Sequence, residues 1–252
     1  MSTQQRLPVN YADMVKNSKL VLLGESSHAI PHYKVELIRA LKALKALGFT
    51  HFAMEMLPIS LKEKIDLYNR TGRGKDSLIN HFKAYWSNVD VNYYQDISTT
   101  AKSLGMVIVP LDIPYEQFDL YPDECSVESL KNKTCKDLHI VRNESWAKTL
   151  VTLVNRGNKV VAFMSKWHVV RRSKYDIGVR SLVRQMNSNA VAIKISGGLY
   201  CLSPTECDDR TDETDSFFNQ RYYTKSAREF VKEIEFSNYT IHLPEVEDSR
   251  AM

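Results

Sequence analysis

Short apolar runs alternate with longer amphipathic segments along most of the chain. A short apolar run that ends near glycine or proline is typical of a buried strand, whereas leucines and alanines that recur every three or four residues are typical of a helix with one buried face. The apolar runs predict strands at Lys19–Gly24, Phe49–Met56, Met106–Asp112, Lys159–Met164, Ala190–Ile195 and Tyr239–Leu243.

Helical spacing fills the segments between these strands. The clearest helix is predicted from about His32 to Leu47, and Lys34, Arg39, Lys42 and Lys45 are expected to face outward from it. Residues 114–136 are expected to form an irregular excursion. Further helices are predicted at 60–68, 76–105, 143–155, 179–186 and 227–235.

This alternation predicts an α/β fold with a mostly parallel β-sheet flanked by helices on both faces. Parallel strands need crossover helices, and right-handed crossovers place helices on the two faces of the sheet. With 252 residues, of which 43% are hydrophobic and 25% charged, the chain has the composition of an ordinary globular protein and no internal repeat. We expect one domain spanning residues 1–252.

Charge and hydropathy limit the function classes. The net charge of +4 and the pI of about 8.7 fall short of the dense basic stripe that a nucleic-acid binder needs. No apolar run approaches the ~20 residues that span a bilayer, and the N-terminal residues lack an apolar signal core and a lipidation cysteine. We expect a cytoplasmic protein, unless a targeting segment has been removed, with a small-molecule or peptide substrate. The pattern does not predict an oligomeric state.

The four cysteines, Cys125, Cys135, Cys201 and Cys207, form neither a CxxC pair nor a zinc-binding spacing. We expect reduced structural thiols. A Cys125–Cys135 disulfide is the alternative if the compartment is oxidising.

Ionisable residues stand at or just beyond the carboxyl ends of the first four predicted strands. Glu25 and His28 follow the first strand, and Glu55 lies near the end of the second. Asp112 ends the third strand, and His168 follows the fourth. In open α/β sheets, ligands bind beyond the carboxyl ends of the strands. The sequence therefore predicts one site that gathers these residues.

Structural roles are the alternatives for the same residues. Glu25 would suit the N-terminus of the following helix, and His28 a hydrogen bond to a neighbouring loop. Glu55 lies in an apolar strand, where an unpaired carboxylate is costly, so it needs a raised pKa or a partner such as Arg142. Asp112 precedes Ile-Pro, which is also ordinary turn chemistry.

The residue types fit general-base chemistry. A histidine with a pKa near ~6.5 can take a proton from water, and a neighbouring carboxylate fixes its tautomer and stabilises the imidazolium. A second histidine, His168, could position a substrate or have a structural role. The same His/Glu set could instead hold a divalent metal. The sequence contains no GxSxG elbow, Walker loop or GxGxxG motif, so nothing indicates a covalent nucleophile.

Two segments resemble a known superfamily. LLGESSHAIPHYKVELIRALKALKALGFTHFAMEM (Leu22–Met56) resembles the opening of the erythromycin-esterase, ChaN and Tiki/TraB superfamily, with its GExxH-like motif and a Glu near the end of the second strand. The helix that starts RNESWA (Arg142–Ala147), followed by KVVAFMSKWHVVR, is similar to the superfamily's "RDxxMA" helix and the strand that ends in "GH". Together the matching stretches cover about a quarter of the chain.

The resemblance implies functional roles for Glu25, His28, Glu55, Arg142 and His168. In the esterase branch the first-motif histidine activates water without a metal, the Tiki branch contains metal-dependent peptidases, and ChaN-type members are haem-binding lipoproteins. This chain departs from each pattern. Ser-Lys-Trp precedes the final His, the helical insert of macrolide esterases has no room, and the lipid-anchor cysteine is absent.

The leading hypothesis is a hydrolase that cleaves an ester, lactone or amide. His28 would be the general base and Glu25 its orienting partner, while Glu55 and Arg142 would form a supporting ion pair and His168 would hold substrate or stabilise negative charge. No cofactor is expected, with a divalent metal or haem as alternatives. A haem-binding protein and an effector or toxin domain are the alternative functions. Substrate-binding residues would be Arg142, Asp112, Lys166 and Trp167.

Two surface segments complete the hypothesis. Arg171, Arg172 and Lys174 could attract an anionic substrate, although solvated basic residues are the simpler interpretation. The acidic stretch Glu206–Asp215 is expected to be a solvated loop, with a lid over the site as the alternative.

Overall fold

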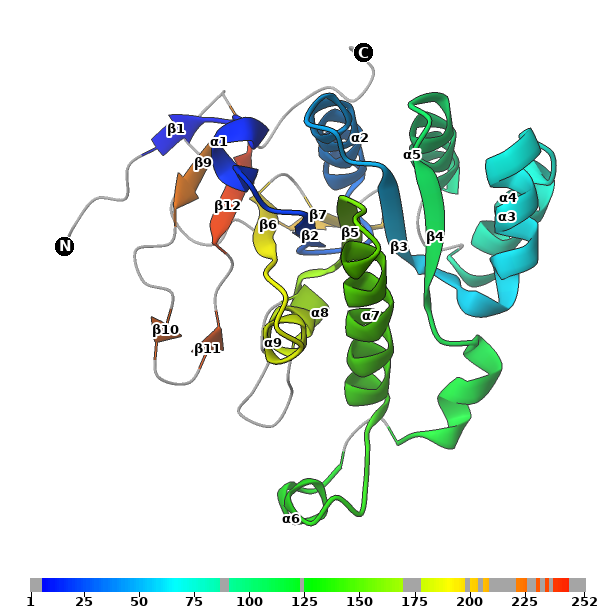
Figure 1. Cartoon of the computed structure of the whole chain (residues 1–252), viewed down its shortest axis with the longest axis vertical. Helices are drawn as coiled ribbons and strands as arrows, with labels where there is room; N and C mark the ends of the chain where they lie inside the picture. Colours follow the sequence, from blue (N-terminus) through cyan, green and yellow to red (C-terminus); the bar gives the residue numbers. More distant parts are fainter. Residues whose placement is uncertain are drawn as a thin grey trace.

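An eight-stranded sheet forms the centre of the computed structural model, which describes residues 6–86, 91–122, 125–169, 178–197, 200–203, 206–208, 221–225, 230–231, 234–235 and 238–244 (Figure 1). The strand order is β1-β9-β12-β6-β2-β5-β3-β4. The strands, in that order, are Arg6–Pro8, Tyr222–Lys225, Tyr239–Leu243, Val191–Gly197, Leu20–Glu25, Val160–Ser165, His51–Pro58 and Val107–Asp112.

The sheet is parallel from β12 to β4 and antiparallel at its other edge. The strand pairs from β12–β6 across to β3–β4 are all parallel, whereas β9 runs antiparallel to β12, and β1 runs antiparallel to β9. The predicted α/β fold with a mostly parallel sheet is confirmed.

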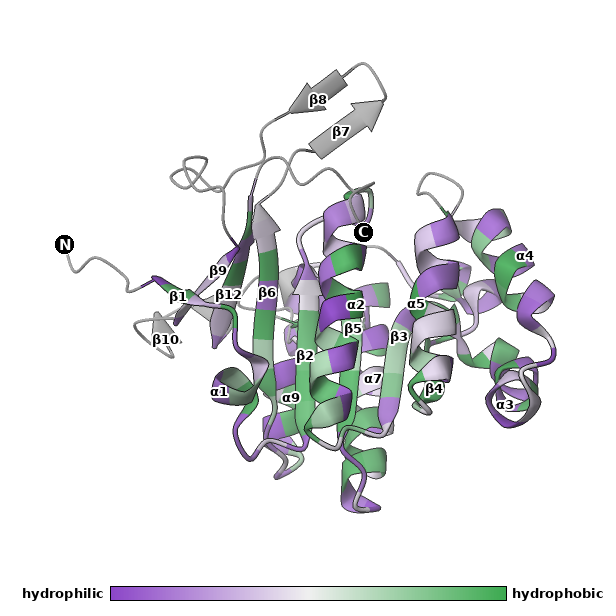
Figure 2. Ribbon diagram, turned by 90° about the horizontal axis from the view of Figure 1, so that it is seen from above, coloured by the Kyte–Doolittle hydropathy of each residue, from purple (hydrophilic) through white to green (hydrophobic). Residues whose placement is uncertain are grey.

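Helices cover both faces of the sheet. One face packs against α1 (Tyr11–Val15), α2 (Pro31–Ala46) and α5 (Val91–Ser103), and the other against α7 (Leu138–Asn155) and α9 (Val179–Gln185). Successive residues of a strand point to opposite faces, so both sets of side chains on the central strands are apolar. Figure 2 shows β2 and β5 as hydrophobic strands between these layers. The remaining helices are η1 (Ile59–Leu61), α3 (Lys62–Thr71), α4 (Lys75–Tyr85), η2 (Tyr115–Leu120), α6 (Val127–Lys131) and α8 (Lys166–Val169).

A side chain of α3 forms hydrogen bonds with the open edge of the strand β4. The Asn69 amide donates to the Ile108 carbonyl at 2.8 Å, and the Ile108 N–H donates to Asn69 Oδ1 at 3.0 Å. Asn69 therefore satisfies the same two backbone groups that a further strand would pair with.

The C-terminal part of the chain differs most from the sequence prediction. The helix expected over Ala227–Glu235 is wrong, because β10 (Phe230–Val231) pairs antiparallel with β11 (Ile234–Glu235). The acidic segment begins as β8 (Glu206–Asp208), which pairs with β7 (Tyr200–Ser203), and its remainder lies outside the described residues. Short apolar runs suit a helix or a strand equally, and here partner strands decide the outcome.

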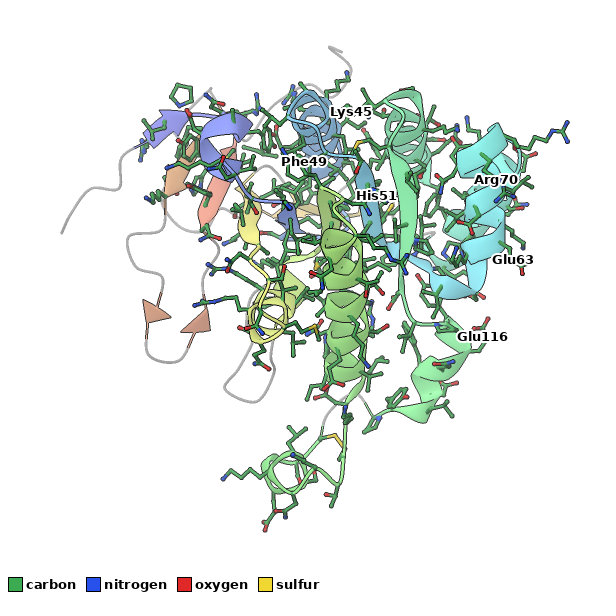
Figure 3. All side chains as sticks on the ribbon, viewed as in Figure 1. Lys45, Phe49, His51, Glu63, Arg70 and Glu116 are labelled. Atoms are coloured by element: carbon green, nitrogen blue, oxygen red, sulfur yellow. A yellow bond between two sulfur atoms is a disulfide. The ribbon has the colours of Figure 1, made fainter. Side chains whose placement is uncertain are left out.

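The expectation of reduced thiols is wrong for two of the four cysteines. Cys125 and Cys135 form a disulfide with a Cα–Cα distance of 6.0 Å, beside α6 (Figure 3). Cys201 and Cys207 are register partners in the β7–β8 pair, and their side chains lie outside the described part. Among the described residues, no helix is long and apolar enough to cross a membrane.

Candidate functional site

A pocket of about 650 Å³ lies at the carboxyl ends of β3, β4 and β5 and is partly open to solvent. Its lining includes His28, Glu55, Asp112, Arg142 and His168. These side chains come from separate strands, from the loop after β2 and from α7 and α8. The structure thus brings the predicted histidines and carboxylates to one place, with Glu25 directly behind His28.

His28 is held by the last residue of β2. Its Nδ1 lies 2.6 Å from Oε1 of Glu25, which is fully buried, whereas 28% of the His28 side chain is exposed. Nδ1 must carry the proton in this bond if Glu25 is ionised, because a carboxylate only accepts. Nε2 makes no hydrogen bond with the residues that the structure describes, so it is the ring nitrogen available to a ligand.

The pKa of His28 is raised above its ordinary value. Burial by itself lowers it, but the charge and hydrogen bond of Glu25, with a further contribution from Glu55, outweigh that effect. The charge of Lys34 opposes the carboxylates. The imidazolium form of His28 therefore persists to a higher pH than that of an unperturbed histidine.

Arg142 joins the two carboxylates at the ends of β3 and β4. Its guanidinium binds Asp112 through Nε and a terminal nitrogen, both at 2.8 Å, and binds Glu55 Oε1 at 2.9 Å. The other Glu55 oxygen accepts a hydrogen bond from the Ser165 backbone at 2.6 Å. The Glu55–Arg142 ion pair expected from the sequence is present. Both carboxylates are almost fully buried, so each depends on this arginine.

Burial raises the pKa of Asp112 to about 6, although the charge and hydrogen bonds of Arg142 oppose this rise. Arg142 itself keeps its proton, because the two carboxylates outweigh the effect of its burial on its pKa. Trp146 also donates to Asp112 Oδ1, at 3.3 Å. Asp112 therefore orients Arg142 from a fully buried position.

His168 is bound through both ring nitrogens. Its Nδ1 lies 2.6 Å from Asn143 Oδ1, and Nε2 lies 3.3 Å from an Arg142 nitrogen. Only 2% of the residue is exposed. The helix that carries it, α8, packs on β2 at Gly24, where a Cβ atom would lie 3.0 Å from Lys166 Cα. These contacts suit His168 to holding Arg142 in place better than to accepting a proton.

Aromatic side chains form much of the remaining pocket wall. Trp86 packs edge-on against His28, with 5.1 Å between ring centroids, and its indole N–H donates to the Tyr115 hydroxyl at 3.2 Å. Tyr85, Phe118 and Trp167 also line the pocket. Aromatic side chains therefore line the same pocket as the charged groups of Glu55, Asp112 and Arg142.

No group of three or more His, Cys, Asp and Glu residues in the described chain is arranged to hold a metal ion. The Arg142 guanidinium already binds the carboxylates of Glu55 and Asp112. A metal ion would have to displace the guanidinium before it could bind these two carboxylates. A metal-independent site stays a prediction.

Other predicted residues take less central positions. Trp167 lines the pocket with 47% of its surface exposed, whereas Lys166 stacks over the Trp167 ring and is not part of the lining. Arg171, Arg172 and Lys174 lie outside the described residues.

Sequence reasoning missed several members of the site. Asn143 is hidden within the predicted α7 helix, and Trp86 reads as an ordinary packing residue. Lys34 was expected to face outward, and this is wrong, because it is fully buried against Glu25. The signal for Lys34 is weak: a lysine in the first turn of the helix that follows a strand-end carboxylate.

Comparisons with known proteins bear on the fold. The chain matches no family model and no curated protein sequence. Among solved structures, a succinoglycan biosynthesis protein matches with a TM-score of 0.61 and 13% identity over 96% of this chain and 94% of that one. ChaN of Campylobacter jejuni, in a structure describing cofacial haem binding, matches with a TM-score of 0.55 and 15% identity over 92% and 91%.

The type III effector HopBA1 matches with a TM-score of 0.53 and 14% identity over 97% of this chain and 98% of that one. At these identities the comparisons concern the fold alone. The chain shares its fold with these three structures, and the match to ChaN agrees with the resemblance of the two sequence segments.

Proposed function

We propose that this protein is a hydrolase that cleaves an ester, lactone or amide, with His28 as the general base. The observation that carries the proposal is the Glu25–His28 pair: a buried carboxylate binds Nδ1 at 2.6 Å, while the half-buried ring lines an open pocket. A carboxylate in this position holds the tautomer whose Nε2 can accept a proton.

The reaction uses water as the nucleophile. Nε2 of His28 takes a proton from water as the water oxygen bonds to the substrate carbonyl carbon, and the carbonyl electron pair moves to oxygen. The intermediate then collapses, the C–O or C–N bond breaks, and the imidazolium returns its proton to the leaving group.

The test measures hydrolysis by wild type and His28→Asn of three probes: p-nitrophenyl acetate as an ester, dihydrocoumarin as an aromatic lactone, and p-nitroacetanilide as an amide. Loss of a general base costs roughly 100- to 10,000-fold in rate. We expect that loss in His28→Asn on each probe that wild type turns over, with an unchanged circular-dichroism spectrum.

His51→Asn is the matched control, because His51 lies at the start of β3 away from the pocket lining. It should retain wild-type rates. The proposal is contradicted if His28→Asn is folded and as active as His51→Asn, or if wild type hydrolyses none of the probes.

Haem binding is the second candidate, because ChaN of Campylobacter jejuni shares the fold and its structure is described as binding haem. His28 and Tyr115 are ligand types that haem iron accepts, and aromatic walls suit a porphyrin. However, Arg142 is the one Lys or Arg among the described lining residues, and its carboxylate partners already bind it. No lining cation is therefore left for the propionates.

Titration with haemin distinguishes the candidates. We expect no saturable one-to-one change in the Soret band. A sharp one-to-one titration that is lost in His28→Asn and kept in His51→Asn would place haem binding ahead of hydrolysis.

A further inference from the structure

Lys34 is a buried cation directly behind the pocket. It belongs to the first turns of α2, and none of its surface is exposed. Its Nζ lies 2.6 Å from Glu25 Oε2 and also donates to the backbone carbonyl of His28. The same atom lies 5.5 Å from the centre of the Tyr94 ring. Each of these neighbours suits an ammonium group: a carboxylate, a carbonyl and an aromatic face.

Glu25 bridges the ammonium group and the imidazole. One carboxylate oxygen binds Lys34 and the other binds His28 Nδ1, each at 2.6 Å. Lys34 thus restrains His28 twice, through Glu25 at the ring and through the carbonyl at the backbone. A charge buried this deeply is tolerated when it is paired, and removing one partner leaves the other uncompensated.

We propose that Lys34 is a positioning residue that fixes Glu25 and the His28 backbone, so that the imidazole keeps one orientation toward the pocket. The contacts of Lys34 with Glu25 and with the His28 carbonyl are present whatever reaction the protein catalyses. The effect of Lys34 on turnover rests on the proposed hydrolase function.

The charges around His28 define what Lys34 does electrostatically. Burial lowers the pKa of His28, Glu25 and Glu55 raise it, and Lys34 lowers it. The other titratable or charged side chains of the described pocket lining are Tyr85, Asp112, Tyr115, His139, Arg142 and His168. Without Lys34, burial alone would oppose the effect of Glu25 and Glu55, which favour the imidazolium. Lys34 therefore keeps a larger share of His28 in the neutral form that accepts a proton.

The test is an NMR titration of the His28 ring nitrogens, with the signals assigned by their loss in His28→Asn. Lys34→Met should move the His28 midpoint upward by about 1 pH unit, as expected when a nearby cation is removed. Lys34→Arg should restore most of the wild-type value. Lys42→Met removes the same charge from an exposed position on the same helix and should leave the midpoint unchanged.

An unchanged or lower midpoint in folded Lys34→Met overturns the proposal. If Lys34→Met does not fold, the proposal is tested by NMR on the wild-type protein instead. Its Lys34 ammonium signal, assigned by its loss in Lys34→Arg, should exchange slowly with water and shift as His28 titrates. Fast exchange, or no response to His28, overturns the proposal. Neither readout uses a substrate, so absent hydrolysis would contradict the proposed function alone.

Discussion

His28 and His168, two of the three histidines that line the pocket, differ in what their ring nitrogens contact. His28 binds Glu25 through Nδ1 and makes no hydrogen bond through Nε2 with the described residues, whereas His168 is buried and bound by Asn143 and Arg142. A general base needs a free nitrogen within reach of water. These contacts favour His28 over His168 as the proposed base and suit His168 to positioning Arg142.

Arg142 should contribute strongly to stability, because it is the shared partner of two buried carboxylates. Arg142→Met removes the shared partner of Glu55 and Asp112, both almost fully buried, and should lower the free energy of unfolding by about 3–5 kcal/mol. Urea denaturation measures this loss. Arg70→Met is the control, because Arg70 is exposed on α3 (Figure 3), and it should change stability by less than about 0.5 kcal/mol.

The same variant has a predicted pH dependence. Burial already raises the pKa of Asp112 to about 6, and removing the arginine that opposes this shift raises it further. A carboxyl group with a raised folded-state pKa binds protons more tightly in the native state, so it favours folding as the pH falls. The destabilisation of Arg142→Met should therefore be smaller at pH ~5 than at pH ~8. If Arg142→Met lost as much unfolding free energy at pH ~5 as at pH ~8, or more, this would contradict an ion pair between Asp112 and Arg142.

At the scale of elements, the exposed edge of the sheet depends on Asn69. Asn69→Ala removes both hydrogen bonds to Ile108, a buried residue of the edge strand β4. Leaving these backbone groups unpaired should cost about 1–3 kcal/mol in urea denaturation. Asn155→Ala, at the exposed end of α7, should have little effect. Similar stabilities for the two variants would show that Asn69 does not protect the edge.

The elements that position the site were predictable from the sequence, and those at the sheet's antiparallel edge were not. The parallel strands β2, β3 and β5 are buried on both faces and therefore form mainly apolar runs, and the edge strand β4 is buried over most of its length. By contrast, β1 is three residues long, and α1 starts at an Asn10 cap within a polar segment. Phe230, Val231 and Ile234 have helical spacing but pair as strands. Local pattern cannot identify an element whose partner is distant in the chain.

Apart from Arg142, which the superfamily resemblance indicated, the candidate site was predictable only at or just beyond the ends of strands. Glu25, Glu55 and Asp112 are recognisable because a charge at the end of an apolar run has few structural explanations. Lys34 and Asn143 are helix residues whose burial depends on how α2 and α7 pack, and the sequence carries no sign of that rotation.

At the scale of the whole molecule, the disulfide bears on the compartment. Disulfides persist in oxidising environments and are rare in the cytosol. The Cys125–Cys135 bond therefore weighs against the predicted cytoplasmic location. Protein alkylated without reductant and digested with trypsin should yield the peptide Thr134–Lys136 linked to the peptide that contains Cys125. Prior reduction should separate them, and alkylation of both cysteines without reductant would contradict the bond.

In the proposed reaction His28, held by Glu25, activates water. The most direct test compares the pH dependence of kcat/KM on a hydrolysed probe with the NMR titration of His28 in the same protein. We predict that activity rises with pH along an acid limb whose midpoint lies above ~6.5, because the raised pKa delays formation of the neutral base. That midpoint should equal the His28 pKa and fall in Glu25→Gln. A midpoint that differs from the His28 pKa, or that Glu25→Gln leaves in place, would show that His28 is not the base.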